Sequence, residues 1–311
     1  MRWFAALLVV MLAACAEIPP PLVERMEPRL TDRAMIAADG AELPLRRWLP
    51  AGEPRAVIAA LHGFNDYSAF FDLPAPSLTA AGIAIYAYDQ RGFGRAPAVG
   101  YWPGEAALRS DLYGFLRLLA ARHPGKPLFV LGESMGAAVA LTALSHPAID
   151  RADLPPLSGV ILVAPAVWSR DQMPWYQDAA LWIGARLLPW MTVSGRGLHI
   201  QASDNIEMLR RMSRDPLVIK ETRISTIEGL CDLMDAASLA PGRIDLPGLL
   251  LLGAHDEVVP NEASQAMLAR KSRFLQPRLY PEGYHMLLRD LHAEQPLNDI
   301  KSWIASRGER S

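Results

Sequence analysis

Cysteine is scarce in this chain of 311 residues, which contains only Cys15 and Cys231. We assign Cys15 to an N-terminal leader (below), so the mature chain can form no intramolecular disulfide, and its cysteine content does not identify the compartment. Neither sign of charge is in excess, since 31 Lys and Arg face 33 Asp and Glu. A nucleic-acid partner would require a basic face, so this balance predicts no nucleic-acid partner.

Motifs for metal and phosphate chemistry are missing too. The chain has no His-Glu-x-x-His helix motif and no phosphate-binding loop that ends in Gly-Lys-Ser/Thr. Gly92-Phe93-Gly94 lacks the third glycine of a dinucleotide-binding loop and is soon followed by Pro97, so we interpret it as a turn. The sequence therefore predicts neither a metal nor a cofactor.

The apolar run near the N-terminus, from Trp3 to Met11, is too short to span a bilayer comfortably. It follows Arg2 and precedes Leu12-Ala13-Ala14-Cys15, which resembles the lipobox of bacterial lipoproteins, where the cysteine is lipidated and becomes the new amino terminus. We therefore predict a lipoprotein signal peptide over residues 1–14 and lipid attachment at Cys15. Ordinary secretion is the alternative, because small residues flanking Cys15 also fit a small-x-small cleavage site.

Residues 15–30 include Pro19-Pro20-Pro21 and predict a proline-rich tether between the lipid and the rest of the chain. Ala16 is not the aspartate that tends to retain lipoproteins of enteric bacteria in the inner membrane. The predicted location is therefore the bacterial cell envelope, with the lipid anchor in the outer membrane and the protein facing the periplasm; a secreted soluble protein is the alternative. Residues 31–311 suit one large α/β domain with an insertion.

The central motif of the sequence is Gly132-Glu133-Ser134-Met135-Gly136. The apolar residues 128–131 before it suit a short buried strand, and the Ala-rich residues 137–140 after it favour a helix. A serine on such a sharp strand-to-helix turn exposes its hydroxyl at the carboxyl end of the sheet, beside the first N–H groups of the helix. The pattern predicts that Ser134 is a nucleophile, which then requires a base and a group that orients the base.

Apolar segments alternate with helical ones along most of the chain. Asp39-Gly40 predicts a hairpin turn between residues 34–38 and 42–49. Further strands are expected at 56–61, 83–88, 128–131, 160–163, 249–252 and 278–280, and helices at 68–81 and 105–122. This alternation predicts an α/β fold, with a mostly parallel central sheet and helices on both faces.

The stretch between Pro165 and Pro247 departs from this alternation, and prolines divide it into short helices. It holds four of the eight tryptophans: Trp168, Trp175, Trp182 and Trp190. We predict a helical cap insertion at about residues 166–240, whose aromatic side chains line an apolar substrate tunnel. Ordinary packing of these side chains is the alternative.

Two later strands are followed by side chains that could act as the base for Ser134 and as the group that orients this base. Residues 249–252 lead into Gly253-Ala254-His255-Asp256, and residues 278–280 lead, a few positions on, to His285. Catalytic groups of open α/β sheets collect at such strand ends. The order Ser134, Asp256, His285 is the one expected of an α/β-hydrolase triad, with His285 as the base and Asp256 as its partner.

Other candidates for these roles are weaker. Asp232 and Asp235 lie in the helical insertion and are the alternative acidic residues. His62 follows the strand at 56–61, and we expect it to be structural and bonded within its own loop. Because the first strand-to-helix loop supplies an oxyanion N–H in this fold, we assign the backbone N–H groups of Phe64 and Met135 to the oxyanion hole.

Several motifs together are similar to the monoacylglycerol lipase and lysophospholipase group of α/β-hydrolases, and the likeness covers nearly the whole mature chain. These motifs are residues 62–68, 89–94, 132–136, 253–260 and 283–287. The resemblance implies the α/β-hydrolase fold and a serine hydrolase that cleaves single-chain lipid esters, such as monoacylglycerols or lysophospholipids, through an acyl-enzyme. The lipoprotein leader is not part of that group's pattern.

Two alternatives to this function stay open. A general carboxylesterase would act on soluble short-chain esters with the same triad. A surface-anchored binding protein could keep the fold without chemistry, because fold alone does not imply function.

Overall fold

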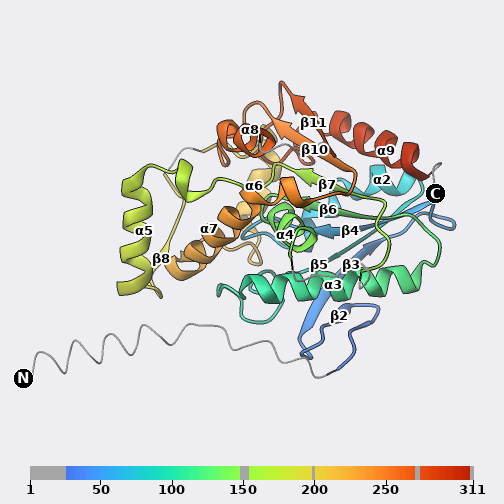
Figure 1. The fold of residues 1–311 in the computed structure, drawn as a ribbon, viewed down its shortest axis with the longest axis horizontal. Coiled ribbons are helices and arrows are strands. Elements are labelled where there is room, and N and C mark those ends of the chain that lie inside the picture. The colour runs from blue at the N-terminus through green and yellow to red at the C-terminus, as the bar shows by residue number, and fades with distance from the viewer. Residues whose placement is uncertain (1–25, 148–153, 198–199, 270–273, 309–311) are drawn as a thin grey trace, which may run out of the picture.

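Among the residues that the computed structural model describes, nine strands form one central sheet in the order β1-β2-β3-β5-β4-β6-β7-β10-β11 (Figure 1). The structure describes residues 26–147, 154–197, 200–269 and 274–308. The strands are β1 (Arg29–Leu30), β2 (Ala34–Ile36), β3 (Glu42–Trp48), β4 (Ala56–Leu61), β5 (Ile83–Tyr88), β6 (Leu128–Glu133), β7 (Gly159–Val163), β10 (Gly248–Gly253) and β11 (Leu275–Tyr280).

The sheet is parallel from β5 through β4, β6, β7 and β10 to β11, and antiparallel only from β1 to β3 and where β3 meets β5. Every residue of β4, β5, β6, β7 and β10 is buried, as expected of parallel strands covered on both faces. The predicted mostly parallel sheet is confirmed, and so is the hairpin at Asp39-Gly40, because β2 and β3 pair as antiparallel neighbours.

Helices cover both faces of this sheet and bury two separate apolar clusters (Figure 1). One face is covered by α3 (Glu105–Arg122), α4 (Met135–Leu144), α7 (Ile224–Leu239) and α8 (Asn261–Ala269). The other is covered by the 3-10 helix η2 (Ser68–Asp72), α2 (Ala75–Ala80) and α9 (Glu294–Gly308). The single helix expected over residues 68–81 is therefore wrong in detail: it is divided into η2 and α2 at Pro74, since proline has no N–H to donate to the carbonyl four residues before it.

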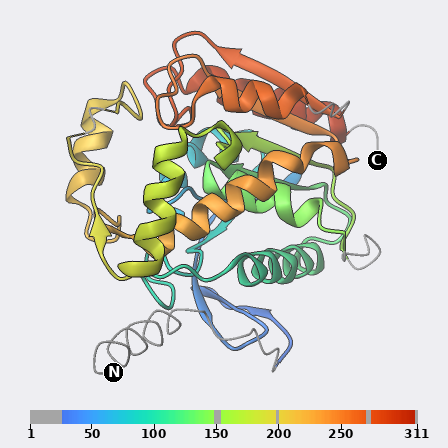
Figure 2. The same ribbon diagram turned by 60° about the vertical axis from the view of Figure 1, so that its left-hand side comes forward.

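Between β7 and β10 the chain forms smaller elements at one end of the sheet. They are η4 (Arg170–Gln172), α5 (Trp175–Leu187), β8 (Thr192–Val193), α6 (Ile206–Arg214), β9 (Thr222–Arg223), α7 and η5 (Pro241–Arg243). Helix α5 packs beside α7, and α7 in turn packs on α4, the helix that follows Ser134 (Figure 2). None of the helices in the described residues is long and apolar enough to cross a membrane.

The predicted tether extends two residues too far into the chain. Residues 1–25, with the predicted signal peptide and the lipid-attachment residue Cys15, lie outside the described part of the chain. Arg29–Leu30, however, form β1, which pairs with β2, and Leu30 packs against the apolar core. Residues 29 and 30 therefore belong to the sheet and not to an extended tether.

The predicted tryptophan-lined tunnel is only partly correct. Trp168 lines the main cavity, but Trp175 is 81% exposed and Trp182 is 56% exposed, so neither is a wall of that cavity. The spacing along α5 explains this result. Gln177 and Leu181 lie four residues apart on the side that faces the cavity, and Trp175 and Trp182 lie seven apart on the side turned away.

Candidate active site

Ser134 stands between β6 and α4 in a strained backbone conformation. Its φ is +51° and its ψ is −114°, which a residue with a side chain rarely adopts. Strand β6, which precedes Ser134, is fixed in the middle of the parallel sheet. The N–H of Ser134 itself donates to the carbonyl of Val163 at 2.9 Å. The strain is thus held by the surrounding structure, and it presents the Ser134 hydroxyl to the cavity that the residue lines.

The two glycines of the motif make this turn possible. A Cβ on Gly132 would lie 2.5 Å from the backbone nitrogen of Ala137, and one on Gly136 would lie 2.3 Å from the carbonyl oxygen of Leu61. Helix α4 can therefore approach both β6 and β4 only because these positions have no side chain. Close approach places the N-terminus of α4, with its free N–H groups, directly beside the serine.

Asp256 and His285 meet at the ends of β10 and β11. His285 Nδ1 donates to Asp256 Oδ2 at 2.8 Å, which leaves Nε2 as the acceptor nitrogen of a neutral ring. The other carboxylate oxygen of Asp256 accepts the N–H groups of Val258 and Val259, both at 2.9 Å. The acid is therefore held in place by its own turn, and the imidazole is oriented by the acid.

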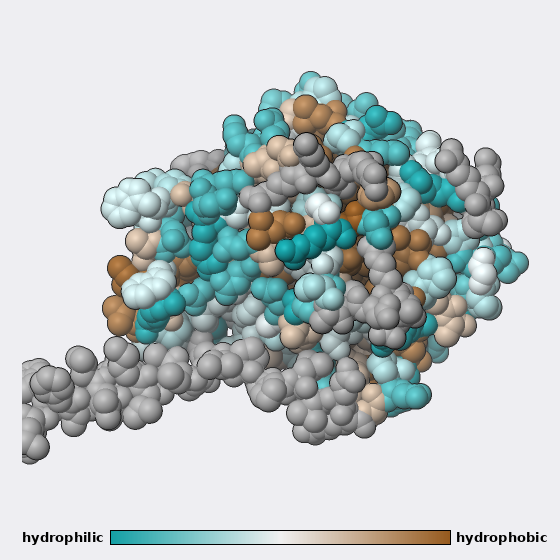
Figure 3. All heavy atoms as spheres, in the orientation of Figure 1, coloured by the Kyte–Doolittle hydropathy of each residue, from teal (hydrophilic) through white to brown (hydrophobic). Residues whose placement is uncertain are grey.

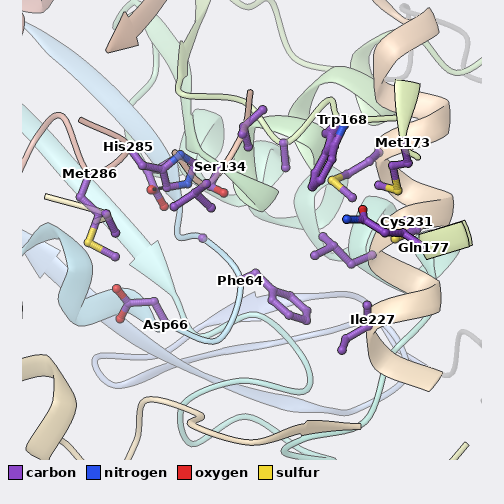
Figure 4. A pocket seen from close by; sticks show the side chains of 18 of the residues that line it. Phe64, Asp66, Ser134, Trp168, Met173, Gln177, Ile227, Cys231, His285 and Met286 are labelled. Carbon is purple, nitrogen blue, oxygen red and sulfur yellow. Dashed lines mark ion pairs between the residues drawn. The ribbon is translucent and has the colours of Figure 1, made fainter. Parts of the chain in front are cut away.

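Burial and the neighbouring charge shift the pKa of His285 in opposite directions. Burial in the protein lowers the pKa of the imidazole, but the neighbouring Asp256 carboxylate raises it by its charge and its hydrogen bond, and the net result is a raised pKa. His285 and Ser134 both line the same cavity, and their side chains lie next to each other in Figure 4. The structure thus brings together the three residues that the sequence suggested as a triad.

The two backbone N–H groups assigned to the oxyanion hole belong to residues near Ser134: Met135 directly follows it, and Phe64 follows Gly63, on which a Cβ would lie 3.3 Å from Ser134 Cβ. Within the described residues the structure records no acceptor for the N–H of Phe64, in the loop after β4, or for that of Met135, the first residue of α4. His62 acts structurally, as expected: Nδ1 donates to the carbonyl of Gly63 at 2.8 Å, and Nε2 accepts the N–H of Gln90 at 2.9 Å. These bonds fix the loop that carries Phe64.

A cavity of about 450 Å³ opens over Ser134 and His285. Figure 4 shows the two polar side chains at one side of it and the side chains of Trp168, Met173 and Ile227 at the other. The further lining residues include Leu181, Leu230, Cys231, Met234, Val258, Val259 and Met286. The size falls within the usual range of small-molecule sites, and the wall opposite the triad is almost wholly apolar.

The weaker acidic candidates are engaged elsewhere. Asp232 and Asp235 lie on α7 and both form ion pairs with Arg170, at 2.8 Å in the case of Asp232. Neither lines the cavity. Across the described ranges, no cluster of three or more His, Cys, Asp or Glu side chains has a geometry that could hold a metal ion.

Three charged residues of the site were not found from the sequence. Glu133 lines the cavity beside Ser134, and Asp66 lines it from the loop after β4. Arg289 pairs with Asp66 at 2.9 Å and donates to the carbonyl of Phe70 at 3.0 Å. Asp66 and Arg289 are far apart in the chain, so only the fold reveals their pairing, whereas Glu133 occupies a variable position of the serine motif and gave no signal of its own.

Comparison with known proteins identifies relatives over most of the chain. This chain is 27% identical over 289 residues to “Monoglyceride lipase” of Mus musculus, and the aligned region covers 88% of this chain and 90% of the relative. This chain is also 24% identical over 286 residues to “Monoacylglycerol lipase” of Mycolicibacterium smegmatis, and the aligned region covers 89% of this chain and 97% of that relative.

Solved structures show the same fold. The crystal structure of Paleococcus ferrophilus monoacylglycerol lipase matches with a TM-score of 0.71 and 23% identity, over 86% of this chain and 99% of that one. A soluble variant of monoglyceride lipase from Saccharomyces cerevisiae, in complex with a substrate analog, matches with a TM-score of 0.71 and 20% identity, over 93% and 99%. The predicted α/β-hydrolase fold is therefore confirmed.

The family model described as “Serine aminopeptidase, S33” (Hydrolase_4) matches residues 52–292, a span that holds most of the sheet and all three residues of the candidate triad. The chain belongs to this family of hydrolases.

Proposed function

We propose that this protein is a serine hydrolase that cleaves carboxylic esters of single-chain lipids, monoacylglycerols or lysophospholipids, through an acyl-enzyme. One observation carries the proposal: Ser134 on its strained turn and His285, which Asp256 orients, line one end of a cavity whose other wall is apolar. An ester group at the polar end would leave its acyl chain against the apolar wall. The names of the relatives from mouse and M. smegmatis support the same substrate class.

The proposed mechanism assigns each group one task. His285 Nε2 takes the hydroxyl proton of Ser134 as the oxygen attacks the ester carbonyl, and Asp256 stabilises the imidazolium that forms. The N–H groups of Phe64 and Met135 bind the negative oxygen of the tetrahedral intermediate. His285 returns the proton to the leaving alcohol, which departs and leaves an acyl-enzyme. Water, activated by the same imidazole, then releases the fatty acid and regenerates Ser134.

A substrate panel tests this proposal. Hydrolysis rates would be measured for monoacylglycerols, lysophospholipids and p-nitrophenyl esters of increasing acyl length, with an aminoacyl p-nitroanilide as the amide counterpart. The proposal expects kcat/KM to rise with acyl length, and the lipid that is cleaved faster identifies the head group. A preference for acetyl esters would instead support the short-chain carboxylesterase. The absence both of turnover and of covalent labelling by a fluorophosphonate would support the silent binding protein.

The apolar wall gives a prediction on chain length. Leu181→Ala removes a side chain that lines the cavity from α5, and we expect kcat/KM for long-chain esters to fall by about 5- to 30-fold, since the lost contact is worth roughly 1–2 kcal/mol. Acetyl esters should be nearly unaffected, because they do not reach this wall. The matched control is Trp175→Ala on the outer face of the same helix, which should leave the chain-length profile of soluble esters unchanged. Equal losses on short and long esters would show that Leu181 serves packing only.

The outer face of α5 supports a lipid interface as the place of action. It exposes Trp175, Tyr176, Trp182, Ile183 and Leu187, each at least half exposed. Hydrophobic side chains are visible at this end of the molecule in Figure 3. Tryptophan and tyrosine favour the boundary between lipid and water, and contiguous exposed apolar side chains mark interaction surfaces. This face would lie against the membrane that holds the substrate.

The proposed location rests on the leader. We propose that Cys15 carries lipid and holds the protein at the outer membrane of a bacterial envelope, facing the periplasm, with plain secretion as the alternative. Several acyl chains on one cysteine anchor stably, whereas one chain is marginal. Cys15→Ser should therefore move the protein from the membrane fraction to the soluble fraction, with the rate on a soluble ester unchanged. A wild-type protein that is already soluble and unlipidated would contradict the anchor.

A further inference from the structure

A second carboxylate lies beside His285, on the side opposite Asp256. Glu133 is only 2% exposed, and its Oε1 lies 3.9 Å from His285 Nε2, the nitrogen that does not bond to Asp256. Asp256 occupies the other ring nitrogen, Nδ1, at 2.8 Å. The imidazole is therefore flanked by one acidic group at each nitrogen, and the mechanism above uses only one of them.

The fold provides space for this second carboxylate. Glu133 ends β6 and directly precedes Ser134, so the sheet fixes its backbone as firmly as that of the serine. A Cβ on Gly63, in the loop after β4, would lie 2.2 Å from Glu133 Oε2. The carboxylate thus occupies the volume that the absent side chain of Gly63 leaves free, and it lies against the loop that carries Phe64.

The charged groups around Glu133 favour an interaction with His285. Asp66, Arg289, Asp256 and His285 face it, and Asp66 and Arg289 pair with each other at 2.9 Å, so their charges largely offset one another. Burial raises the pKa of Glu133 to about 7, and the imidazolium of His285 is the strongest influence that lowers it. Asp290 is a further acidic group facing the imidazole. The protonation of each of these two buried groups therefore depends on the charge of the other.

We propose that the Glu133 carboxylate acts through His285: it stabilises the imidazolium and thereby raises the pH below which activity is lost. This inference rests on the proposed role of His285 as the base. When Nε2 takes the proton of Ser134, the new positive charge lies between two acidic groups, which favours the step. In the free enzyme the same attraction keeps His285 protonated, and hence inactive as a base, up to a higher pH. Glu133 would thus be a positioning residue, since it need not touch the substrate.

The test is the pH profile of kcat/KM on a soluble short-chain ester, for wild type and for Glu133→Gln. Removing an opposite charge at this distance should lower the pKa of the base by about one unit or more. The acid limb of the profile, where kcat/KM falls as the pH decreases, should therefore move to lower pH by about one unit. The plateau value of kcat/KM at higher pH should fall by up to about tenfold, the equivalent of one pKa unit. An acid limb that stays within about 0.2 units of wild type would overturn the inference, because a residue that only fills space would alter stability without moving this limb.

Two further variants complete the experiment. Glu133→Asp keeps the charge but withdraws it from His285 by one methylene. The acid limb of this variant should therefore lie between those of wild type and Glu133→Gln. If the glutamine variant does not fold, the comparison of Glu133→Asp with wild type tests the inference. Glu262→Gln removes an exposed acidic charge on α8 and should leave the limb unchanged. If His285→Ala retains activity, the proposed function fails; if it is inactive and the limb of Glu133→Gln does not move, only the role of Glu133 fails.

Discussion

Ser134→Ala is expected to lower kcat by about 10⁴- to 10⁶-fold while the fold is retained. The hydroxyl is the proposed nucleophile, and no other side chain could form the acyl-enzyme from the same turn. Alanine also fits the space, because Ser134 is 8% exposed and its small side chain faces the cavity. The measurement is ester hydrolysis under saturating substrate, together with loss of fluorophosphonate labelling and an unchanged thermal unfolding midpoint.

Matched controls separate chemistry from structure in this experiment. Ser145→Ala at the other end of α4 removes a hydroxyl from the same helix and should keep normal turnover. His285→Ala should be as inactive as Ser134→Ala, because the two residues act as a unit, whereas His255→Ala on the exposed turn beside Asp256 should remain active. A Ser134→Ala protein with a near-normal rate would refute the proposed nucleophile.

Two members of the candidate triad, Ser134 and Asp256, could be proposed from the sequence because each follows a strongly apolar strand. Strands β6 and β10 are short, fully buried runs, and the residues after such strands gather at one edge of a parallel sheet. Strand β11 is different, since four of its six residues are exposed. His285 was nevertheless proposed as the base, because the histidine follows this strand closely and comes last in the expected chain order.

The cap shows where composition alone misleads. The number of tryptophans suggested a tunnel, but their positions along α5 place Trp175 and Trp182 on the outer face and Leu181 on the inner face. Applying the helical period of 3.6 residues to this segment would have separated the two faces. The period alone could not have shown which face of α5 lines the cavity, since that depends on how α5 packs against α7.

Charged pairs across the fold could not be read from the sequence at all. Asp66 and Arg289 form their buried ion pair across the interface between the loop after β4 and the segment after His285. Such a pair leaves no local periodicity, because each partner is a single polar residue in an irregular segment. It joins two loops of the candidate site, and this arrangement follows only from the topology of the sheet.

Asp256→Asn is expected to lower kcat near neutral pH by about 10⁴-fold without loss of the fold. The asparagine carbonyl can still accept the N–H groups of Val258 and Val259, so the turn should survive. Its amide NH₂ would then point at His285 Nδ1, which now donates to the aspartate at 2.8 Å. Two donors cannot bond to each other, so the ring would take the other tautomer, with the proton on Nε2. That nitrogen could no longer accept the proton of Ser134.

The matched control for this substitution is Asp232→Asn, because Asp232 was the alternative acid in the sequence. Its carboxylate is 57% exposed, pairs with Arg170 and does not line the cavity, so turnover should stay within about twofold of wild type. The decisive comparison is kcat for the two variants on one soluble ester, with unfolding midpoints measured in parallel. If Asp256→Asn kept more than a tenth of the wild-type kcat, the hydrogen bond to Nδ1 would not control the tautomer, and the acid of the triad would have to be sought elsewhere.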